Sequence, residues 1–272
     1  ASIRSQTPSR GRVNYASLSP PMSIVLFEDR TTHAWIRINR PEKRNAMNRE
    51  AREALRDALD KARSFNAVAI TGVDTTFCGG IDLKEVQEEA TRGSEAALAD
   101  WRALNAEIRE HPAVFIAAIN GLALGGGVTL TGVCDLAIAV DDAEFGMPEV
   151  GFGMYPNPAG PATQLSLPRK RAAWMVLTAE RVDATTAVDW GLVNEAVPRE
   201  QLESRVDEIA ASLARFDTTT LSQCKYMLDE VPLATSDWRG AFRAGVSANA
   251  RIKSANDPAA AALARFKRGE RN

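Results

Sequence analysis

The chain has 272 residues, 45% of them hydrophobic, and a formal net charge of −2. A chain of this length can bury a substantial core, and the balanced charge argues against a nucleic acid partner, because a phosphate backbone calls for a basic surface. No apolar run is long enough to span a bilayer.

Cysteine and histidine usage limits the chemistry further. Three cysteines, Cys78, Cys134 and Cys224, are odd in number, far apart and outside any Cys-x-x-Cys spacing. This pattern argues against a disulfide framework or a zinc site and favours a reducing compartment. His33 and His111 alone are available for a metal or a catalytic triad. We therefore expect no metal.

Residues 1–21 form the first unit that the composition predicts. They carry three arginines and no acid, and they are rich in Ser and Pro, which is typical of disorder. They could be a mitochondrial transit segment or an expression leader. We favour the leader and a cytoplasmic protein, because Met22 followed by SIVLF is typical of a natural start.

Two apolar segments after Met22 predict a hairpin. They are SIVLF (23–27) and AWIRINR (34–40), and the second alternates Ala34, Ile36 and Ile38 toward one face, as a half-buried strand does.

The segment 48–62 predicts an amphipathic helix. Its apolar residues recur at helical spacing, with Arg, Glu and Asp on the opposite face. The apolar stripe consists of Ala51, Ala54, Leu55, Ala58, Leu59 and Ala62.

Three short and almost continuously apolar runs follow, at 67–72, 113–121 and 136–140. Such runs are typical of strands buried on both faces. Because helical or glycine-rich stretches separate them, the sequence predicts an α/β fold. We divide the folded part into a core, 22–199, and a C-terminal region, 200–272, which is mostly helical and has no strand candidate.

Two glycine-rich turns each connect a predicted strand to a helix start. The first is TTFCGGIDLKE (75–85), and the second is NGLALGGGVTLTGVCD (120–135). The glycines could merely allow a helix to pack closely on a strand. Alternatively, the unpaired N–H groups of the two helix starts could together form a pocket for a developing oxyanion. The G-x-G-x-x-G spacing of a dinucleotide turn and the Gly-Lys-Ser/Thr of a phosphate loop are absent.

At these two turns the chain resembles the crotonase, or enoyl-CoA hydratase/isomerase, superfamily. The resemblance covers almost everything after Met22. Three further segments carry it in the order of the family: INRPEKRNAM (38–47), AEFGMPEVGFGMYP (143–156) and AVDWGLVNEAVP (187–198).

The resemblance implies a fold, an assembly and a substrate class. The fold would be a crotonase-like spiral of ββα units with a C-terminal helical trimerisation region. The assembly would be a homotrimer or a dimer of trimers. The substrate would be an acyl-CoA thioester, so that coenzyme A enters as part of the substrate and no separate cofactor is needed.

The resemblance also implies roles for single residues. The backbone amides of Ile81 and Gly126 would form the oxyanion hole. Of the two glutamates that family hydratases use, Glu149 is kept and Thr129 replaces the other. The apolar neighbours of Glu149 in the sequence would raise its pKa toward a useful acid/base value.

The lone glutamate leaves the chemistry open. One carboxyl can remove a proton and return it elsewhere, so isomerisation is the economical interpretation. A hydroxyl in place of the first glutamate also occurs in family members that hydrate phenylpropenoyl thioesters. Thr129 therefore does not exclude hydration, and its hydroxyl could equally bond back to the preceding helical turn.

Substrate contacts are assigned on the same resemblance. Phe152, Tyr155 and Asn157 lie where the family shapes its acyl pocket, in a stretch that is longer and richer in proline than is usual; Asn157 replaces the nucleophilic aspartate of the dehalogenase branch. The remaining predicted contacts are Lys43, Arg44, Ala46, Gly79, Asp82 and Gly125, with 264–270 as a tail that reaches the ligand of a neighbouring subunit.

Other functions remain as alternatives. They are another enolate reaction (hydratase-lyase, C–C cleavage or formation, decarboxylation or thioester hydrolysis) and a non-catalytic acyl-CoA-binding relative. A serine hydrolase is disfavoured, because neither histidine lies in a motif that pairs it with a nucleophile.

Overall fold

The computed structural model describes residues 23–234, 236–256 and 268. The predicted leader, 1–21, lies outside the described residues, and so does the predicted tail 264–270 apart from Arg268.

The main sheet has six strands in the order β1-β2-β3-β5-β7-β10. The first two pair antiparallel, which confirms the predicted hairpin, and every other neighbouring pair is parallel. All residues of β3 and β5 are buried, as their continuous apolar runs predict. The strands are β1 (Val25–Asp29), β2 (Ala34–Ile38), β3 (Ala67–Gly72), β5 (Val114–Ile119), β7 (Leu136–Val140) and β10 (Glu195–Val197).

A second sheet of four very short strands was not predicted. Its order is β4-β6-β8-β9, and the strands are β4 (Thr76–Cys78), β6 (Leu122–Leu124), β8 (Glu144–Gly146) and β9 (Val182–Asp183). The prediction that each glycine turn directly follows a buried strand is therefore wrong: β4 and β6 intervene. Two or three residues are too few to show a strand period.

The pairing of β4 with β6 positions the two glycine turns. The strands are parallel, and Gly79 follows β4 as Gly125 follows β6. Because the carboxyl ends of parallel neighbours meet at one edge of a sheet, the two turns lie side by side.

The first four helices are α1 (Arg49–Ala62), α2 (Leu83–Ala90), α3 (Ala96–Glu110) and α4 (Gly126–Val133). The predicted stripe of α1 is buried except at Ala54, which is half-buried. Arg52, predicted on the exposed face, is buried as well. Its guanidinium pairs with Glu85 of α2 at 2.9 Å and with Asp100 of α3 at 2.6 Å, so one charged group connects three helices.

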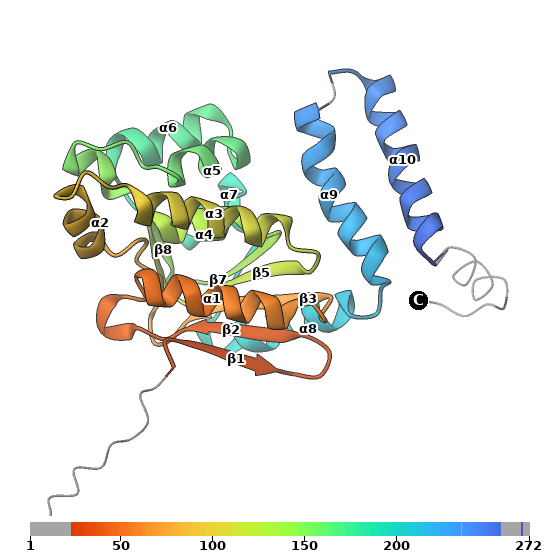
Figure 1. Ribbon diagram of the computed structural model, residues 1–272, viewed down its shortest axis with the longest axis horizontal. Helices are drawn as coiled ribbons and strands as arrows, with labels where there is room; N and C mark the ends of the chain where they lie inside the picture. Colours follow the sequence, from red (N-terminus) through yellow and green to blue (C-terminus); the bar gives the residue numbers. More distant parts are fainter. Residues whose placement is uncertain (1–22, 235, 257–267, 269–272) are drawn as a thin grey trace, which may run out of the picture.

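From Glu200 onward the described residues are mostly helical, as predicted. Figure 1 shows α2 and α10 at opposite ends of the molecule, with α9 and α10 beside the core as a helical pair. The helices are α5 (Ala159–Ser166), α6 (Arg169–Thr178), α7 (Ala184–Trp190), α8 (Leu202–Leu213), α9 (Thr218–Ala234) and α10 (Trp238–Asn256), with short 3-10 helices η1 (Pro41–Lys43), η2 (Pro148–Phe152) and η3 (Arg199–Gln201). Among the described residues, no helix is both long and apolar enough to cross a bilayer.

Candidate active site

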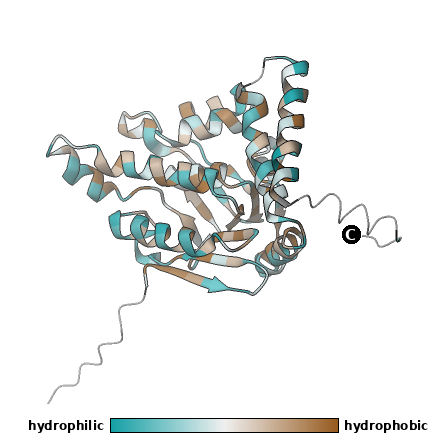
Figure 2. Ribbon diagram, turned by 45° about the vertical axis from the view of Figure 1, so that its right-hand side comes forward, coloured by the Kyte–Doolittle hydropathy of each residue, from teal (hydrophilic) through white to brown (hydrophobic). Residues whose placement is uncertain are grey.

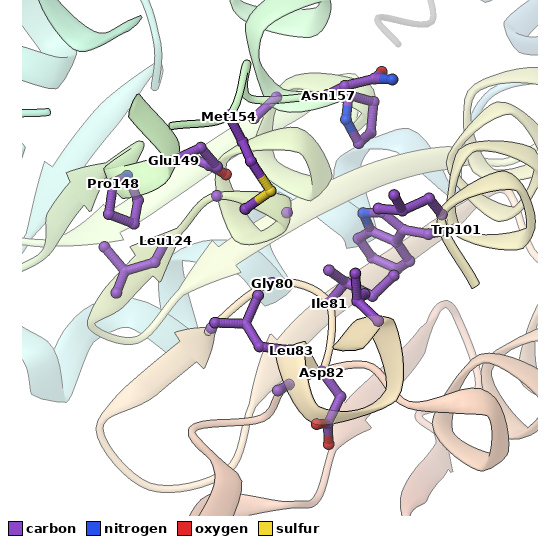
Figure 3. A pocket seen from close by; sticks show the side chains of 18 of the residues that line it. Gly80, Ile81, Asp82, Leu83, Trp101, Leu124, Pro148, Glu149, Met154 and Asn157 are labelled. Atoms are coloured by element: carbon purple, nitrogen blue, oxygen red, sulfur yellow. The ribbon is translucent and has the colours of Figure 1, made fainter. Parts of the chain in front are cut away.

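A cavity of about 810 Å³ opens at the edge of the small sheet, within the usual size of small-molecule sites. Its walls come from η1, the two glycine turns, α3, η2 and the start of α5. Figure 3 shows Glu149 and Trp101 pointing into it from opposite sides, with Gly80 and Ile81 between them.

The first glycine turn leaves the Ile81 amide free. The Met47 N–H donates to Gly80 O at 2.8 Å, and the Asp82 N–H donates to Met47 O at 3.2 Å. Because backbone groups alternate sides along an extended segment, the Ile81 N–H points away from Met47. Among the described residues it has no acceptor.

The second glycine turn leaves the Gly126 amide free. Gly125 holds a φ of 50° at the N-cap of α4, a conformation that favours glycine, and its N–H donates to Gly146 O at 2.8 Å. Gly126 is the first residue of α4, where N–H groups have no partner within the helix. Its N–H finds no acceptor elsewhere in the described part of the chain.

The two turns that carry the free amides approach so closely that neither Gly80 nor Gly126 leaves room for a side chain. A Cβ on Gly80 would lie 2.9 Å from Gly126 N, and a Cβ on Gly126 would lie 3.2 Å from Ile81 N. Position 126 therefore requires glycine, because the two turns approach too closely for a Cβ. The close packing that the glycines suggested in the sequence is confirmed, and the oxyanion pocket stays a prediction.

Glu149 lies on η2 with its carboxylate next to Gly125. A Cβ on Gly125 would collide with Glu149 Oε1. Glu149 Oε2 is buried and has no hydrogen-bond partner in the described residues. Burial raises the pKa of Glu149, because the charged carboxylate loses hydration, and a hydrogen bond from its own backbone amide offsets part of this rise. The direction of the pKa shift is the predicted one.

The cations and small residues predicted near coenzyme A also line the cavity. Lys43 and Arg44 are exposed at its rim, and Ala46 and Gly79 are half-buried in its wall. Asp82 lines the cavity too, but its carboxylate caps α2 through the Lys84 N–H and pairs with Arg40 at 3.2 Å. Figure 3 shows this carboxylate pointing away from the centre of the cavity.

The predicted acyl-pocket residues form an exposed margin. Phe152 is 63% exposed and Tyr155 is 54% exposed, and both line the cavity. The Tyr155 hydroxyl is held by Gln164 Nε2 at 2.7 Å. The Asn157 carboxamide points away from the centre in Figure 3.

Thr129 is the one predicted site residue that does not line the cavity. It is buried in α4, and its Oγ1 has no hydrogen-bond partner in the described structure. The alternative bond to the preceding helical turn is absent at Thr129, whereas Thr131 makes such a bond to Gly127 O at 3.0 Å.

Several lining residues were missed from the sequence. Leu98, Trp101 and Arg102 share one face of α3, and Leu124 and Met154 complete the apolar wall. The sequence shows Trp101 as a bulky residue on the helix that precedes the glycine triplet. A bulky residue in a helix is by itself typical of a core position, so it does not indicate a site.

The two histidines lie outside the cavity. His33 Nε2 lies 2.8 Å from Asp207 Oδ1, and burial lowers the pKa of His111 to about 4. Within the described ranges, no three His, Cys, Asp or Glu side chains cluster as a metal ion requires.

Comparison with known proteins agrees with this architecture. The model of the enoyl-CoA hydratase/isomerase family matches residues 28–236. Hydroxycinnamoyl-CoA hydratase-lyase of Pseudomonas fluorescens is 32% identical over 71% of this chain and 73% of its own length. 2,3-Dehydroadipyl-CoA hydratase of Escherichia coli is 33% identical over 76% of this chain and 82% of its own length.

A solved enoyl-CoA hydratase from Bacillus anthracis superposes with a TM-score of 0.83 at 27% identity, covering 91% of this chain and 97% of that one. The extent of the family match, together with these relatives, confirms the resemblance and the predicted fold class. The chain belongs to the enoyl-CoA hydratase/isomerase family.

Proposed function

We propose that this protein binds an acyl-CoA thioester and stabilises its enolate, with coenzyme A entering as part of the substrate. The Ile81 and Gly126 amides would bind the thioester oxygen, and Glu149 would be the acid/base. One observation carries the proposal: two amides that have no acceptor among the described residues belong to neighbouring turns that line one cavity, beside a glutamate whose pKa burial raises.

The proton transfer follows from this arrangement. Glu149 removes a proton from the α-carbon, the C–H bonding pair becomes the enolate, and negative charge develops on the thioester oxygen. Each amide donor stabilises that charge by roughly 3 kcal/mol on the scale of other oxyanion holes. A raised pKa suits the carboxyl to accept and return a proton near neutral pH.

Isomerisation is the first candidate reaction. The proton that Glu149 takes from the α-carbon of a 3-enoyl thioester returns to the γ-carbon, which gives the 2-enoyl thioester with no gain or loss of atoms. A single carboxyl is enough for this shuttle, and Glu149 is the only carboxylate predicted to act here.

Hydration is the second candidate, and Thr129 favours it. Its buried hydroxyl lacks a protein partner within the described structure, so it could hydrogen-bond a water molecule. Two of the relatives are named as hydratases or hydratase-lyases. Because Thr129 does not line the cavity, this reaction needs a water molecule to connect its hydroxyl to the substrate.

Glu149→Gln tests the proposal. We expect kcat for the interconversion of 3-hexenoyl-CoA and 2-hexenoyl-CoA to fall by about 10²- to 10⁴-fold, the usual contribution of a general acid/base, with little change in the Kd of butyryl-CoA. Glu180→Gln, at an exposed position outside the cavity, is the control. Near-normal turnover in Glu149→Gln removes Glu149 from the mechanism.

A comparison at Thr129 separates the two candidates. We expect isomerisation to exceed hydration at matched chain length, and Thr129→Glu to raise hydration by supplying the second carboxyl. Deuterium oxide reports exchange at the α-carbon. Brisk hydration without isomerisation, abolished in Thr129→Val, identifies the hydratase instead.

The C-terminal helices support assembly with further copies of the chain. Figure 2 shows hydrophobic bands alternating with hydrophilic ones along them. Their exposed apolar side chains include Leu228, Leu233, Trp238, Phe242 and Val246, each at least 65% exposed. A face of this kind is typical of an interface.

Light scattering tests the trimer or hexamer. We expect Phe242→Glu with Val246→Glu to reduce the mass toward that of the monomer, while Leu177→Glu, at an exposed apolar position on α6, leaves the assembly intact. A monomeric wild-type protein contradicts the assembly.

A further inference from the structure

Trp101 brings an unused hydrogen-bond donor to the cavity. Its side chain is fully buried, it lines the cavity, and its Nε1 has no acceptor in the described residues. A buried N–H without a partner is destabilising, because it has given up its hydrogen bond to water. Among the described residues, five buried side-chain polar atoms lack a hydrogen-bond partner, and only those of Trp101 and Glu149 belong to this cavity.

The indole N–H lies beside the two free amides. The position that a Cβ on Gly126 would occupy is 2.9 Å from Trp101 Nε1 and 3.2 Å from Ile81 N. The two nitrogens are therefore at most about 6 Å apart, and Gly126 lies next to both. Two nitrogens at most about 6 Å apart can both donate to one oxygen atom between them, because N–H···O distances are about 2.7–3.2 Å.

The indole is held in place by its helix. Asp100, the preceding residue, binds the buried Arg52 at 2.6 Å, and Asn105 Nδ2 donates to Trp101 O at 2.8 Å. Trp101 and Glu149 also point into the cavity from opposite sides (Figure 3), so the indole N–H does not hydrogen-bond the Glu149 carboxylate.

We infer that the Trp101 indole N–H is a third donor to the thioester oxygen, an inference that rests on the proposed oxyanion hole. A carbonyl oxygen with two lone pairs can accept only a weak third hydrogen bond beside the two amides, whereas an enolate oxygen has a third lone pair and more negative charge. The third donor therefore binds the enolate more strongly than the ground state, and such differential binding raises kcat rather than lowering KM.

Trp101→Phe keeps an aromatic ring and removes the donor. We expect kcat on 3-hexenoyl-CoA to fall by about 10²-fold, the effect of losing one oxyanion donor, with KM within a few-fold of wild type. Trp190→Phe is the matched control, because Trp190 is partly buried and lies outside the cavity. If Trp101→Phe folds poorly, site-specific 3-benzothienylalanine at position 101 keeps the shape of the indole and replaces N–H by sulfur.

Infrared spectroscopy of bound butyryl-CoA, labelled with ¹³C at the carbonyl, provides a readout that a packing role does not change. The wild-type protein should lower the carbonyl stretching frequency relative to water, and the Trp101 variants should lower it less. The Kd of S-butyl-CoA, a thioether without the carbonyl oxygen, should be the same in all variants.

The outcomes separate the two levels of the argument. An unchanged carbonyl frequency in the Trp101 variants, or a loss confined to KM, overturns the third donor and leaves the proposed function standing. If the wild-type protein itself fails to lower the frequency, the oxyanion hole is wrong and the inference about Trp101 falls with it.

Discussion

Gly126→Ala probes the closest approach in the cavity. The added Cβ would lie 2.9 Å from Gly80 Cα and from Trp101 Nε1, and 3.2 Å from Ile81 N. Ordinary carbon contacts are about 3.5–4.0 Å, and the Gly80 backbone cannot rotate away. One of the two turns must therefore shift by several tenths of an ångström.

The cost can be estimated for both stability and activity. Overpacking of this kind costs about 1–3 kcal/mol, which lowers Tm by about 2–12 °C for a chain of this size. Displacing one oxyanion donor by up to about 1 Å lowers kcat/KM by about 10²-fold.

Gly132→Ala, in the same helix, is the control. Its Cβ would meet Ala162 Cβ at 3.6 Å, an ordinary contact, so we expect wild-type activity and a Tm that is unchanged or higher. The assays are thermal unfolding and steady-state turnover of 3-hexenoyl-CoA. A folded Gly126→Ala protein with wild-type kcat/KM would refute an oxyanion hole at this turn.

Three further predictions follow from the same structure. Ile81→Ala should keep activity within a few-fold, whereas Ile81→Pro should lose about 10²- to 10³-fold because proline has no N–H; equal losses would assign the role to the side chain. Only the ionised carboxylate of Glu149 can accept a proton, and burial raises its pKa, so kcat/KM should fall as pH drops through a pKa above the usual value of about 4.3. A fall in kcat/KM that is centred at or below about pH 4.3 would contradict the burial argument. Arg52→Ala should lower the free energy of unfolding in urea by about 3 kcal/mol, because it removes the buried partner of Glu85 and leaves Asp100 with Arg56 alone; Arg63→Ala, whose pair with Asp60 is exposed, should cost about 1 kcal/mol or less, and equal effects of the two substitutions would show that burial adds nothing.

Stability provides an independent check on Glu149. Its raised pKa means that the folded state binds this proton more tightly than the unfolded chain, so the carboxylate lowers stability above the folded pKa. Glu149→Gln should therefore have a higher Tm than wild type at pH 7. The difference should shrink as pH falls through the folded pKa and disappear below about 4.3.

Much of the fold could be predicted from local pattern. The hairpin of β1 and β2 and the helix α1 lie where their hydrophobic patterns predict them, and the buried strands β3, β5 and β7 lie where continuous apolar runs predict them. Each segment is long enough to show its pattern, and each buries apolar side chains, so the interactions that define it are repeated along the segment. The strands of the small sheet have too few residues to carry such a pattern.

The sequence by itself determined which backbone positions could form the site. Glycine at 80, 125 and 126 limits side-chain volume there, and the family resemblance assigned roles to Ile81, Gly126 and Glu149.

Tertiary structure decided what each group contacts. Ile81 and Gly126 become neighbours because β4 pairs with β6, and their amides stay free because Met47 and Gly146 use the adjacent backbone groups. Arg52 is buried because α2 and α3 supply its carboxylates. Trp101 looks like a core residue in the sequence, and only packing against the second glycine turn brings its N–H to the cavity. Hydrogen-bond partners and burial are properties of pairs of residues far apart in the chain, so no local pattern determines them.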